Sequence, residues 1–181
     1  MVSSTDEHLH ELDLPDGVKG ALEGRTLKIT GPLGSVAKNF WRIPVNVKTE
    51  GSKVQITPYT KKKKDVVTAN TATSLIRNMI HGVTKGFTYK LKIVFAHFPV
   101  TVKVKGDEVI IENFMGERSA RTAKIIGDCK VTIQGDDIII KGVSNEEVGQ
   151  SAANLEQATK VKRKDQRIFL DGIYVYEKIR A

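Results

Sequence analysis

The stretches TLKITGPLGSVAKNF (residues 26–40) and EVIIENFMGERSART (residues 108–122) lie far apart in the chain but follow one pattern. In each, a strand-like apolar stretch leads to a glycine. Other positions repeat at nearly the same separation. The matching pairs, separated by 82, 84 and 82 residues, are Gly34 with Gly116, Gly51 with Gly135, and Phe87 with Phe169. Because similarity at a fixed period is typical of repeated structure, the chain is predicted to contain two copies of one folding unit.

Each copy is predicted to combine hairpins with a single helix. In the second copy, VTVKV and EVIIEN flank Gly106-Asp107, and CKVTI and DIIIK flank Gly135-Asp136, which are hairpin patterns. Ser144 and Glu147 then form a capping-box pattern at a helix start. The predicted fold is therefore α+β, with two tandem similar domains that each pack a mostly antiparallel β-sheet against one α-helix.

Apolar residues at helical spacing predict the buried face of each helix. They are Ala69, Ala72, Ile76, Met79 and Val83 in the first copy, and Val148, Ala152, Leu155, Ala158 and Val161 in the second. FTYKLKIVF (residues 87–95) alternates and is predicted to close the first copy, as RIFLDGI closes the second. A boundary near Pro99 then gives an acidic N-terminal segment (1–17), a first domain (18–97) and a second domain (98–181).

The formal net charge of +8 is spread unevenly over the 181 residues. Residues 1–17 contain five acids and no Lys or Arg, residues 18–97 contain 15 basic and 3 acidic residues, and residues 98–181 contain 14 and 13. Such asymmetry favours an acidic partner, either nucleic acid or an anionic membrane, although a solvated basic surface remains the alternative. No apolar run approaches the roughly 18 residues of a membrane span. The single cysteine, Cys129, excludes an intramolecular disulfide and is predicted to be a core residue.

Catalytic and metal-binding patterns are not evident. The chain has neither GxxxxGK[ST] nor GxGxxG after a strand. His8 and His10 are two residues apart in the acidic segment, whereas His81 and His97 have no Cys or carboxylate cluster at ligand spacing. GPLG at residues 31–34 fits the GxxG of a KH domain, but that loop joins two helices and strand-like sequence precedes this one, so a plain turn is predicted. We therefore expect no enzymatic activity, cofactor or metal.

Two basic stretches are candidate phosphate contacts. The first, in a predicted loop before the first helix, is Lys61, Lys62, Lys63 and Lys64. The second follows a strand at Gly116 and contains Arg118, Arg121 and Lys124, whose arginines are suited to forked contacts with phosphate. A solvated lysine run is the alternative for the first. Phe40-Trp41, beside the matching stretch of the first copy, could stack on a base or contact the core or another protein.

The third basic stretch joins the second helix to the last predicted strand. Its cations are Lys160, Lys162, Arg163, Lys164 and Arg167. One or two cations at a helix C-terminus are explained by the helix dipole, but five exceed that need. Phe169 and Tyr174 are expected to anchor this segment in the core, with the cations facing a polyanion.

The same stretch carries a family resemblance. The residues that match the signature are Gln157, Val161, Lys164, Arg167, Phe169, the run Asp171-Gly172-Ile173-Tyr174-Val175, and Lys178. They resemble the large-subunit ribosomal protein six family (ribosomal protein L-six) in its archaeal–eukaryotic form. NMIHGVTKGFTYKLKIVFAHFPV is similar to the end of that family's first domain with its linker, and IENFMGER to the start of its second.

This resemblance implies a cytoplasmic structural constituent of the large ribosomal subunit, not an enzyme. Such proteins bind large-subunit rRNA and neighbouring ribosomal proteins near the stalk base, where GTPase translation factors bind. The resemblance places Lys160, Lys164, Arg167 and the turn Asp171-Gly172 at signature positions, with Lys162 and Arg163 at variable ones. A monomer within the ribosome, without membrane contact, is expected, and residues before about Leu12 are expected to make few phosphate contacts because they are acidic. The alternative is an RNA-binding regulator that acts off the ribosome.

Overall fold

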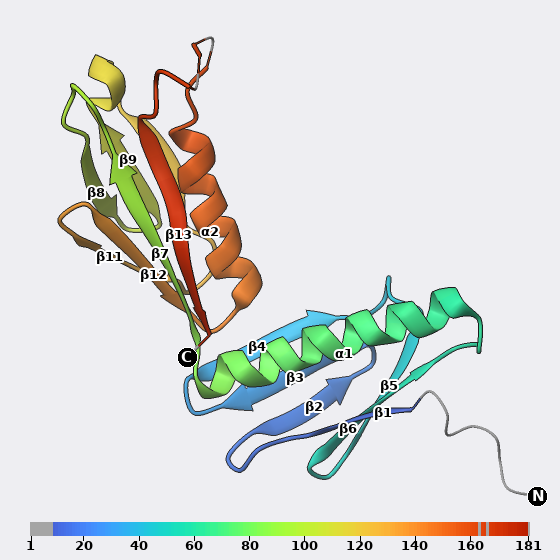
Figure 1. Cartoon of the computed structure of the whole chain (residues 1–181). Helices are drawn as coiled ribbons and strands as arrows, with labels where there is room; N and C mark the ends of the chain where they lie inside the picture. The colour runs from blue at the N-terminus through green and yellow to red at the C-terminus, as the bar shows by residue number, and fades with distance from the viewer. Residues whose placement is uncertain (1–8, 163, 166, 181) are drawn as a thin grey trace, which may run out of the picture. The chain divides into compact units, whose positions relative to one another are not determined.

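The computed structural model describes residues 9–162, 164–165 and 167–180. It divides into two compact units, Met1–Lys85 and Gly86–Ala181 (Figure 1). The first unit contains β1 (His10–Asp13), β2 (Lys19–Glu23), β3 (Thr26–Gly31), β4 (Gly34–Asn39), β5 (Val45–Glu50), β6 (Lys53–Pro58) and α1 (Lys63–Thr84). The second contains β7 (Phe87–Val94), β8 (Thr101–Lys105), β9 (Glu108–Glu112), the short 3₁₀ helix η2 (Phe114–Gly116), β10 (Arg121–Lys124), β11 (Lys130–Gln134), β12 (Asp137–Gly142), α2 (Asn145–Ala158) and β13 (Gly172–Arg180).

The strand order confirms the duplicated α+β fold. The first unit has sheets of order β2-β3-β4 and β1-β6-β5, and the second has β8-β9-β10 and β11-β12-β7-β13. All neighbouring strands are antiparallel. Each unit therefore divides its strands between two sheets, and its helix packs against strands of both. The second unit differs by one added strand, β13, beside β7.

Glycines at matching hairpins explain why the repeat is visible in the sequence. The β2–β3 and β8–β9 turns contain Gly24 and Gly106, with φ of 62° and 58°, and the β5–β6 and β11–β12 turns contain Gly51 and Gly135, with φ of 59° and 62°. Two-residue hairpin turns favour this left-handed backbone, which glycine adopts without strain. The predicted match of Gly51 with Gly135 is confirmed.

Two other predicted matches are wrong. Gly34 begins β4 after a two-residue turn, whereas Gly116 lies in η2, within the longer connection 113–120 between β9 and β10. Phe87 begins β7 and pairs with Gly142. Phe169 precedes β13, outside any strand, and is 36% exposed.

The expected domain boundary also differs from the structure. β7 pairs with β12 and β13, so it belongs to the second unit, where it takes the position that β1 has in the first. The chain divides after Lys85 and not near Pro99. At the other end, β1 pairs with β6 and Leu14 is buried, so part of the acidic segment belongs to the first unit's fold. His8 and the residues before it lie outside the described residues.

The core of the first unit confirms the apolar stripe predicted for its helix. The buried stripe residues on α1 are Ala69, Ala72, Ile76, Met79 and Val83. Residue 31 lies too close to α1 to carry a side chain, because a Cβ there would lie 2.8 Å from the Val83 Cγ2 atom. The Leu33 amide also donates to the Val83 carbonyl at 3.0 Å. The GPLG stretch is therefore a hairpin turn that packs on the end of α1.

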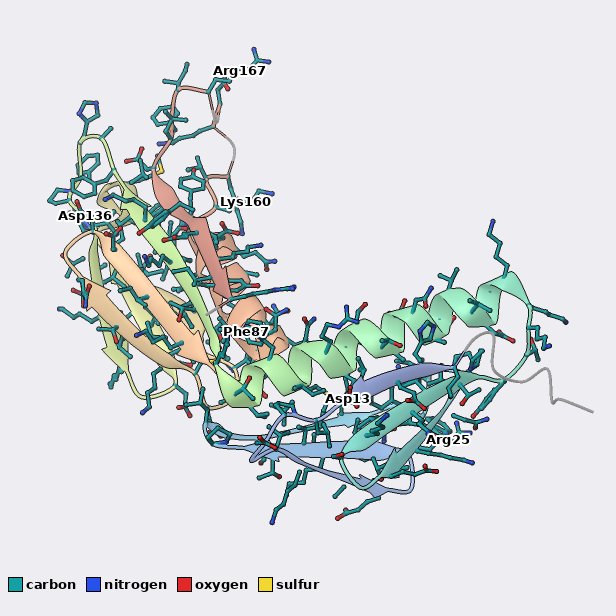
Figure 2. All side chains as sticks on the ribbon, turned by 60° about the horizontal axis from the view of Figure 1, so that its bottom comes forward. Asp13, Arg25, Phe87, Asp136, Lys160 and Arg167 are labelled. Carbon is teal, nitrogen blue, oxygen red and sulfur yellow. The ribbon has the colours of Figure 1, made fainter. Side chains whose placement is uncertain are left out.

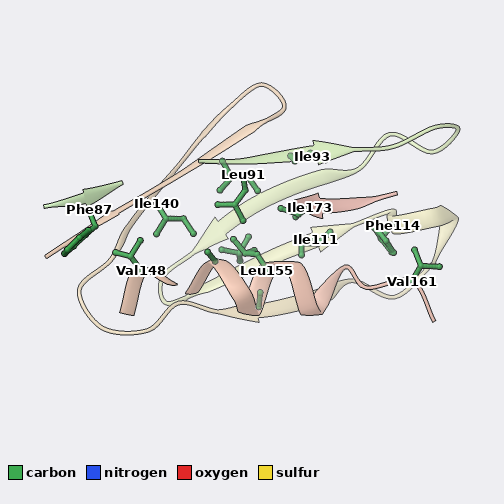
Figure 3. Packing of buried hydrophobic residues seen from close by; sticks show 14 residues of the cluster. Phe87, Leu91, Ile93, Ile111, Phe114, Ile140, Val148, Leu155, Val161 and Ile173 are labelled. Atoms are coloured by element: carbon green, nitrogen blue, oxygen red, sulfur yellow. The ribbon is translucent and has the colours of Figure 1, made fainter. Parts of the chain in front are cut away.

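The core of the second unit lies between α2 and its sheets (Figure 3). From α2 it includes Val148, Ala152 and Leu155, and from the strands Leu91, Ile111, Ile138, Ile140 and Ile173. The Ser144 hydroxyl accepts a hydrogen bond from the Glu147 amide at 3.3 Å, so the predicted N-cap is present. Cys129 packs half-buried against this core, and burial raises the pKa of its thiol.

Candidate nucleic-acid interface

The basic loop (residues 160–170) leaves and rejoins the second unit at two buried polar residues. At its start, the Thr159 hydroxyl donates to the Leu155 carbonyl at 3.1 Å and accepts from the Ile173 amide at 3.0 Å. At its end, Asp171 Oδ1 accepts from the Ala96 amide at 2.9 Å. Because Thr159 and Asp171 are only 2% and 8% exposed, the two ends of the loop are held firmly against the core.

Asp165 shapes the interior of the loop. Its carbonyl accepts from the amides of Ile168 at 3.1 Å and Phe169 at 3.0 Å, and its Oδ1 accepts from the Arg167 amide at 2.9 Å. Lys164 Nζ lies 4.6 Å from the centroid of the Phe169 ring. This turn presents the neighbouring cations on a backbone that local hydrogen bonds define, which favours contact with a fixed partner.

The described cations of the basic loop are all exposed. They are Lys160, Lys162, Lys164 and Arg167, and Figure 2 shows Arg167 extending from the tip of the loop. Arg163 lies outside the described residues. The expected anchoring by Phe169 and Tyr174 is wrong, since Tyr174 is 47% exposed and Phe169 is also on the surface. Thr159 and Asp171 anchor the loop instead, through polar contacts that apolar patterning does not reveal.

Asp171 and Gly172 have positions that do not fit the predicted contact with RNA. Both are buried, and Gly172 begins β13. The Asp171 carboxylate accepts from the Ala96 backbone, so the residue links two segments of the fold. A carboxylate at a turn accepts hydrogen bonds either from solvent or from a donor inside the fold, and here the Ala96 amide is that donor. Both residues are therefore held within the fold, and their contact with RNA stays a prediction.

Arg121 also points inward. Its guanidinium donates to both Glu117 carboxylate oxygens, at 2.6 and 2.8 Å, and to the carbonyls of Ala158 at 2.9 Å and Lys160 at 3.3 Å. It lies 4.3 Å from the centroid of the Phe114 ring. Arg121 therefore ties the 113–120 connection to the end of α2, where free helix carbonyls need donors. The predicted phosphate fork does not fit a guanidinium that is already occupied in this way.

The pKa of Glu117 depends on the charges around this contact. The hydrogen bond from Arg121 is the main cause that lowers the pKa of its carboxyl. Desolvation opposes this, and the positive charges of Arg121 and Lys164 lower the pKa further. Arg121, which donates to both Glu117 and the Lys160 carbonyl, places the start of the basic loop beside the 113–120 connection. Arg118 in that connection and Lys124 on β10 are exposed and remain candidates for phosphate contact.

Arg118 and Arg121 form a matched pair for mutagenesis. We expect Arg121→Ala to lower the free energy of unfolding by about 1–3 kcal/mol, because hydrogen bonds to a charged group and to helix-end carbonyls are lost. Its effect on the salt dependence of RNA binding should be small. Arg118→Ala should leave stability within about 0.5 kcal/mol and lower the salt slope of RNA binding by roughly 0.7–0.9. Chemical denaturation and RNA titration across salt concentrations measure both, and the reverse pattern would contradict the assignment.

The lysine run of the first unit lies partly in a helix and not wholly in a loop. Lys63 and Lys64 form the first turn of α1, and Lys62 is its N-cap without a side-chain cap bond. Cations at a helix N-terminus oppose the helix dipole. Asp65 offsets this in the first turn, and its carboxylate accepts from the Thr60 hydroxyl. All four lysines are exposed, so helix stability does not explain the run.

Sequence reasoning missed a cluster in the first unit. Arg25 donates to the Trp41 carbonyl at 3.3 Å and to the Tyr59 hydroxyl at 2.5 Å. These residues come from the β2–β3 turn, the end of β4 and the end of β6, so no local pattern connects them. Phe40 beside them is 2% exposed and lies in the core, whereas Trp41 is 70% exposed.

In the ranges 9–162, 164–165 and 167–180, no group of three or more His, Cys, Asp or Glu residues could hold a metal ion. No helix formed by those residues has the length and apolar character needed to cross a bilayer.

Comparison with known proteins agrees with the internal repeat. The family model described as Ribosomal protein L6 matches twice, at residues 14–86 and 98–172. The chain belongs to this family. The first match ends close to the division between the two units, and the second begins at residue 98, the predicted start of the second domain, so the interval between them contains β7.

Full-length archaeal relatives support the membership in the ribosomal protein L6 family. The chain is 44% identical over 173 residues to large ribosomal subunit protein uL6 of Methanothrix thermoacetophila, covering 96% of this chain and 98% of the relative. The protein of the same name from Staphylothermus marinus is 46% identical over 175 residues, covering 94% and 95%. That from Methanobrevibacter smithii is 45% identical over 168 residues, covering 93% and 94%.

Proposed function

We propose that this chain is a structural constituent of the large ribosomal subunit that binds large-subunit rRNA through phosphate and shape contacts. The observation that carries the proposal is the basic loop, whose exposed cations Lys160, Lys162, Lys164 and Arg167 are presented between two buried anchors. The relatives named as large-subunit proteins supply the setting.

The chemistry of RNA explains why cations on a loop anchored at both ends suit this role. The major groove of an A-form helix is too deep and narrow for side chains, so a protein contacts phosphates, 2′-hydroxyls and the shape of the backbone. Lys and Arg that neutralise phosphates release counterions, which drives binding. A pocket of about 310 Å³ beside the loop is lined in part by Lys160, Phe169 and Tyr174, which adds aromatic surface next to the charges.

The finer setting follows from the family resemblance. We propose that the chain lies near the stalk base, beside the region where GTPase translation factors bind, as a cytoplasmic monomer within the ribosome. Its partners would be rRNA and neighbouring large-subunit proteins. The role is structural and not catalytic, so any effect on factor GTPase chemistry would act through positioning.

Co-sedimentation tests the ribosomal role. When large subunits of the cells that produce this chain are sedimented in moderate salt, we expect the chain in an amount equal to that of the subunit. An RNA-binding regulator that acts off the ribosome would remain in the supernatant or bind in substoichiometric amounts. Nuclease treatment of the subunits is the control, because a protein held by rRNA is released when the rRNA is cut.

A further inference from the structure

We propose that the first unit carries a second RNA-binding surface, on which Trp41 stacks against an unpaired base while nearby cations bind the flanking phosphates. The aromatic-basic surface consists of Arg25, Trp41, Arg42, Tyr59 and Lys62–Lys64. The proposal rests on the rRNA-binding role above and adds to it the type of RNA element that the first unit recognises: a single-stranded segment, loop or bulge, and not a duplex.

Trp41 is presented in a fixed position. Its amide donates to Asn39 Oδ1 at 2.7 Å, and its carbonyl accepts from Arg25 at 3.3 Å. The preceding residue, Phe40, is buried, and its amide donates to the Arg25 carbonyl at 2.8 Å. The backbone is thus held on both sides while Trp41 remains 70% exposed. An aromatic side chain with two rotatable bonds on a backbone held in this way loses little conformational freedom when it meets a partner.

Arg25 links Trp41 to a second aromatic residue. One of its guanidinium nitrogens donates to the Trp41 carbonyl and the other to the Tyr59 hydroxyl. The guanidinium carbon lies 5.9 Å from the centroid of the Tyr59 ring, which is itself on a residue 43% exposed. Trp41 and Tyr59 therefore belong to one surface, although they follow different strands.

The start of α1 adds positive charge at this end of the unit. The strand pairs that lie at this end of the unit are Thr26 with Asn39 and Val45 with Pro58. Arg42 follows Trp41 directly, and Lys62–Lys64 follow Tyr59 at the beginning of α1. Among the described residues these four cations form no ion pair. Figure 2 shows Arg25 at the end of the unit where α1 begins.

This combination favours RNA over a protein partner. Aromatic rings stack on any base, and surrounding cations neutralise the backbone, which is the usual arrangement for single-stranded nucleic acid. A protein hot spot instead surrounds its aromatic anchor with near-neutral contacts that exclude water. Here the surroundings of Trp41 are basic. The cations at the start of α1 oppose the helix dipole, so helix stability does not explain their presence.

Trp41 is the only tryptophan in the chain, so its fluorescence reports this surface alone. We expect a single-stranded RNA of about 12 nucleotides and mixed sequence to quench it saturably, whereas a duplex of equal length should quench it weakly. The full chain is used with Lys164→Ala and Arg167→Ala, so that binding at the basic loop does not hide the effect. Anisotropy of labelled RNA follows binding independently.

Three variants complete the test. Trp41→Ala should weaken binding of the single strand by roughly 5- to 150-fold, and Trp41→Phe should stay within roughly threefold of the parent because the ring is kept. Leu33→Ala is the matched control, since Leu33 is 53% exposed in the β3–β4 turn at the other end of the unit. It should leave affinity unchanged.

Other outcomes separate this inference from the proposed function. If the unmodified chain binds rRNA fragments but single-stranded RNA never quenches Trp41, the inference is wrong and the proposed function stands. If a mixture of large-subunit proteins free of RNA shifts Trp41 emission to the blue and RNA does not, the surface binds protein and the inference is also wrong. If the unmodified chain binds no rRNA at all, the proposed function fails.

Discussion

Replacing Lys164 and Arg167 together by alanine should weaken binding to large-subunit rRNA by roughly 25- to 60-fold at about 0.1 M salt. Each cation that neutralises a phosphate contributes a slope of about 0.7–0.9 to the dependence of log affinity on log salt. Between 1 M and 0.1 M salt, that slope corresponds to a gain in affinity of roughly five- to eightfold per contact. Both side chains are exposed, so the fold should remain intact.

The matched control removes the same charge elsewhere in the second unit. Lys105 and Lys130 are exposed, and they lie at the ends of β8 and β11 that are distant from the basic loop. Their double alanine variant should change the rRNA salt slope far less. Binding is measured with rRNA fragments across a salt series, and thermal melts monitor folding. An unchanged salt slope in the Lys164/Arg167 variant would mean that these cations form only a solvated surface and do not contact phosphates.

Replacing Phe114 by alanine should lower the free energy of unfolding of the second unit by about 3–5 kcal/mol. Phe114 is 1% exposed, packs in the core of Figure 3, and has the Arg121 guanidinium over its ring at 4.3 Å. Its removal leaves a cavity and also loses the contact that helps hold the 113–120 connection. Urea denaturation followed by far-ultraviolet circular dichroism measures the change, with the two units allowed separate transitions.

Phe169→Ala is the matched control for Phe114→Ala. The sequence predicts Phe169 as a buried match of Phe87, whereas in the structure it is exposed and contacts Lys164. Its loss should therefore change the free energy of unfolding by at most about 1 kcal/mol, the size of an exposed cation–π contact. Comparable destabilisation by both variants would mean that Phe169 is buried, and would contradict the arrangement of the basic loop.

Features with a local cause were predictable from the sequence. The buried stripe of α1, the glycine turns at Gly51 and Gly135 and the Ser144 cap depend on residues within a few positions of one another. Helical spacing, left-handed φ and a side-chain acceptor near free amides act at that range. The duplicated α+β fold was predictable for the same reason, because each copy repeats these local patterns.

The exposed cations of the basic loop were also predictable, because long charged side chains remain in solvent unless a partner draws them inward. Arg121 and Asp171 have such partners, and these come from distant segments: the carbonyls of Ala158 and Lys160 for one and the amide of Ala96 for the other. Only the tertiary structure shows that both side chains have hydrogen-bond partners within the fold.

Tertiary structure likewise decided the pairing of β7 and the Trp41 surface. The alternation in residues 87–94 predicts a strand but not its neighbours, and β12 and β13 supply them in the second unit. Trp41 is held through Arg25, which also binds Tyr59, and these three residues follow or precede different strands. Periodicity determines which face of an element is apolar, whereas strand pairing and the partners of polar groups depend on which segments the fold brings together.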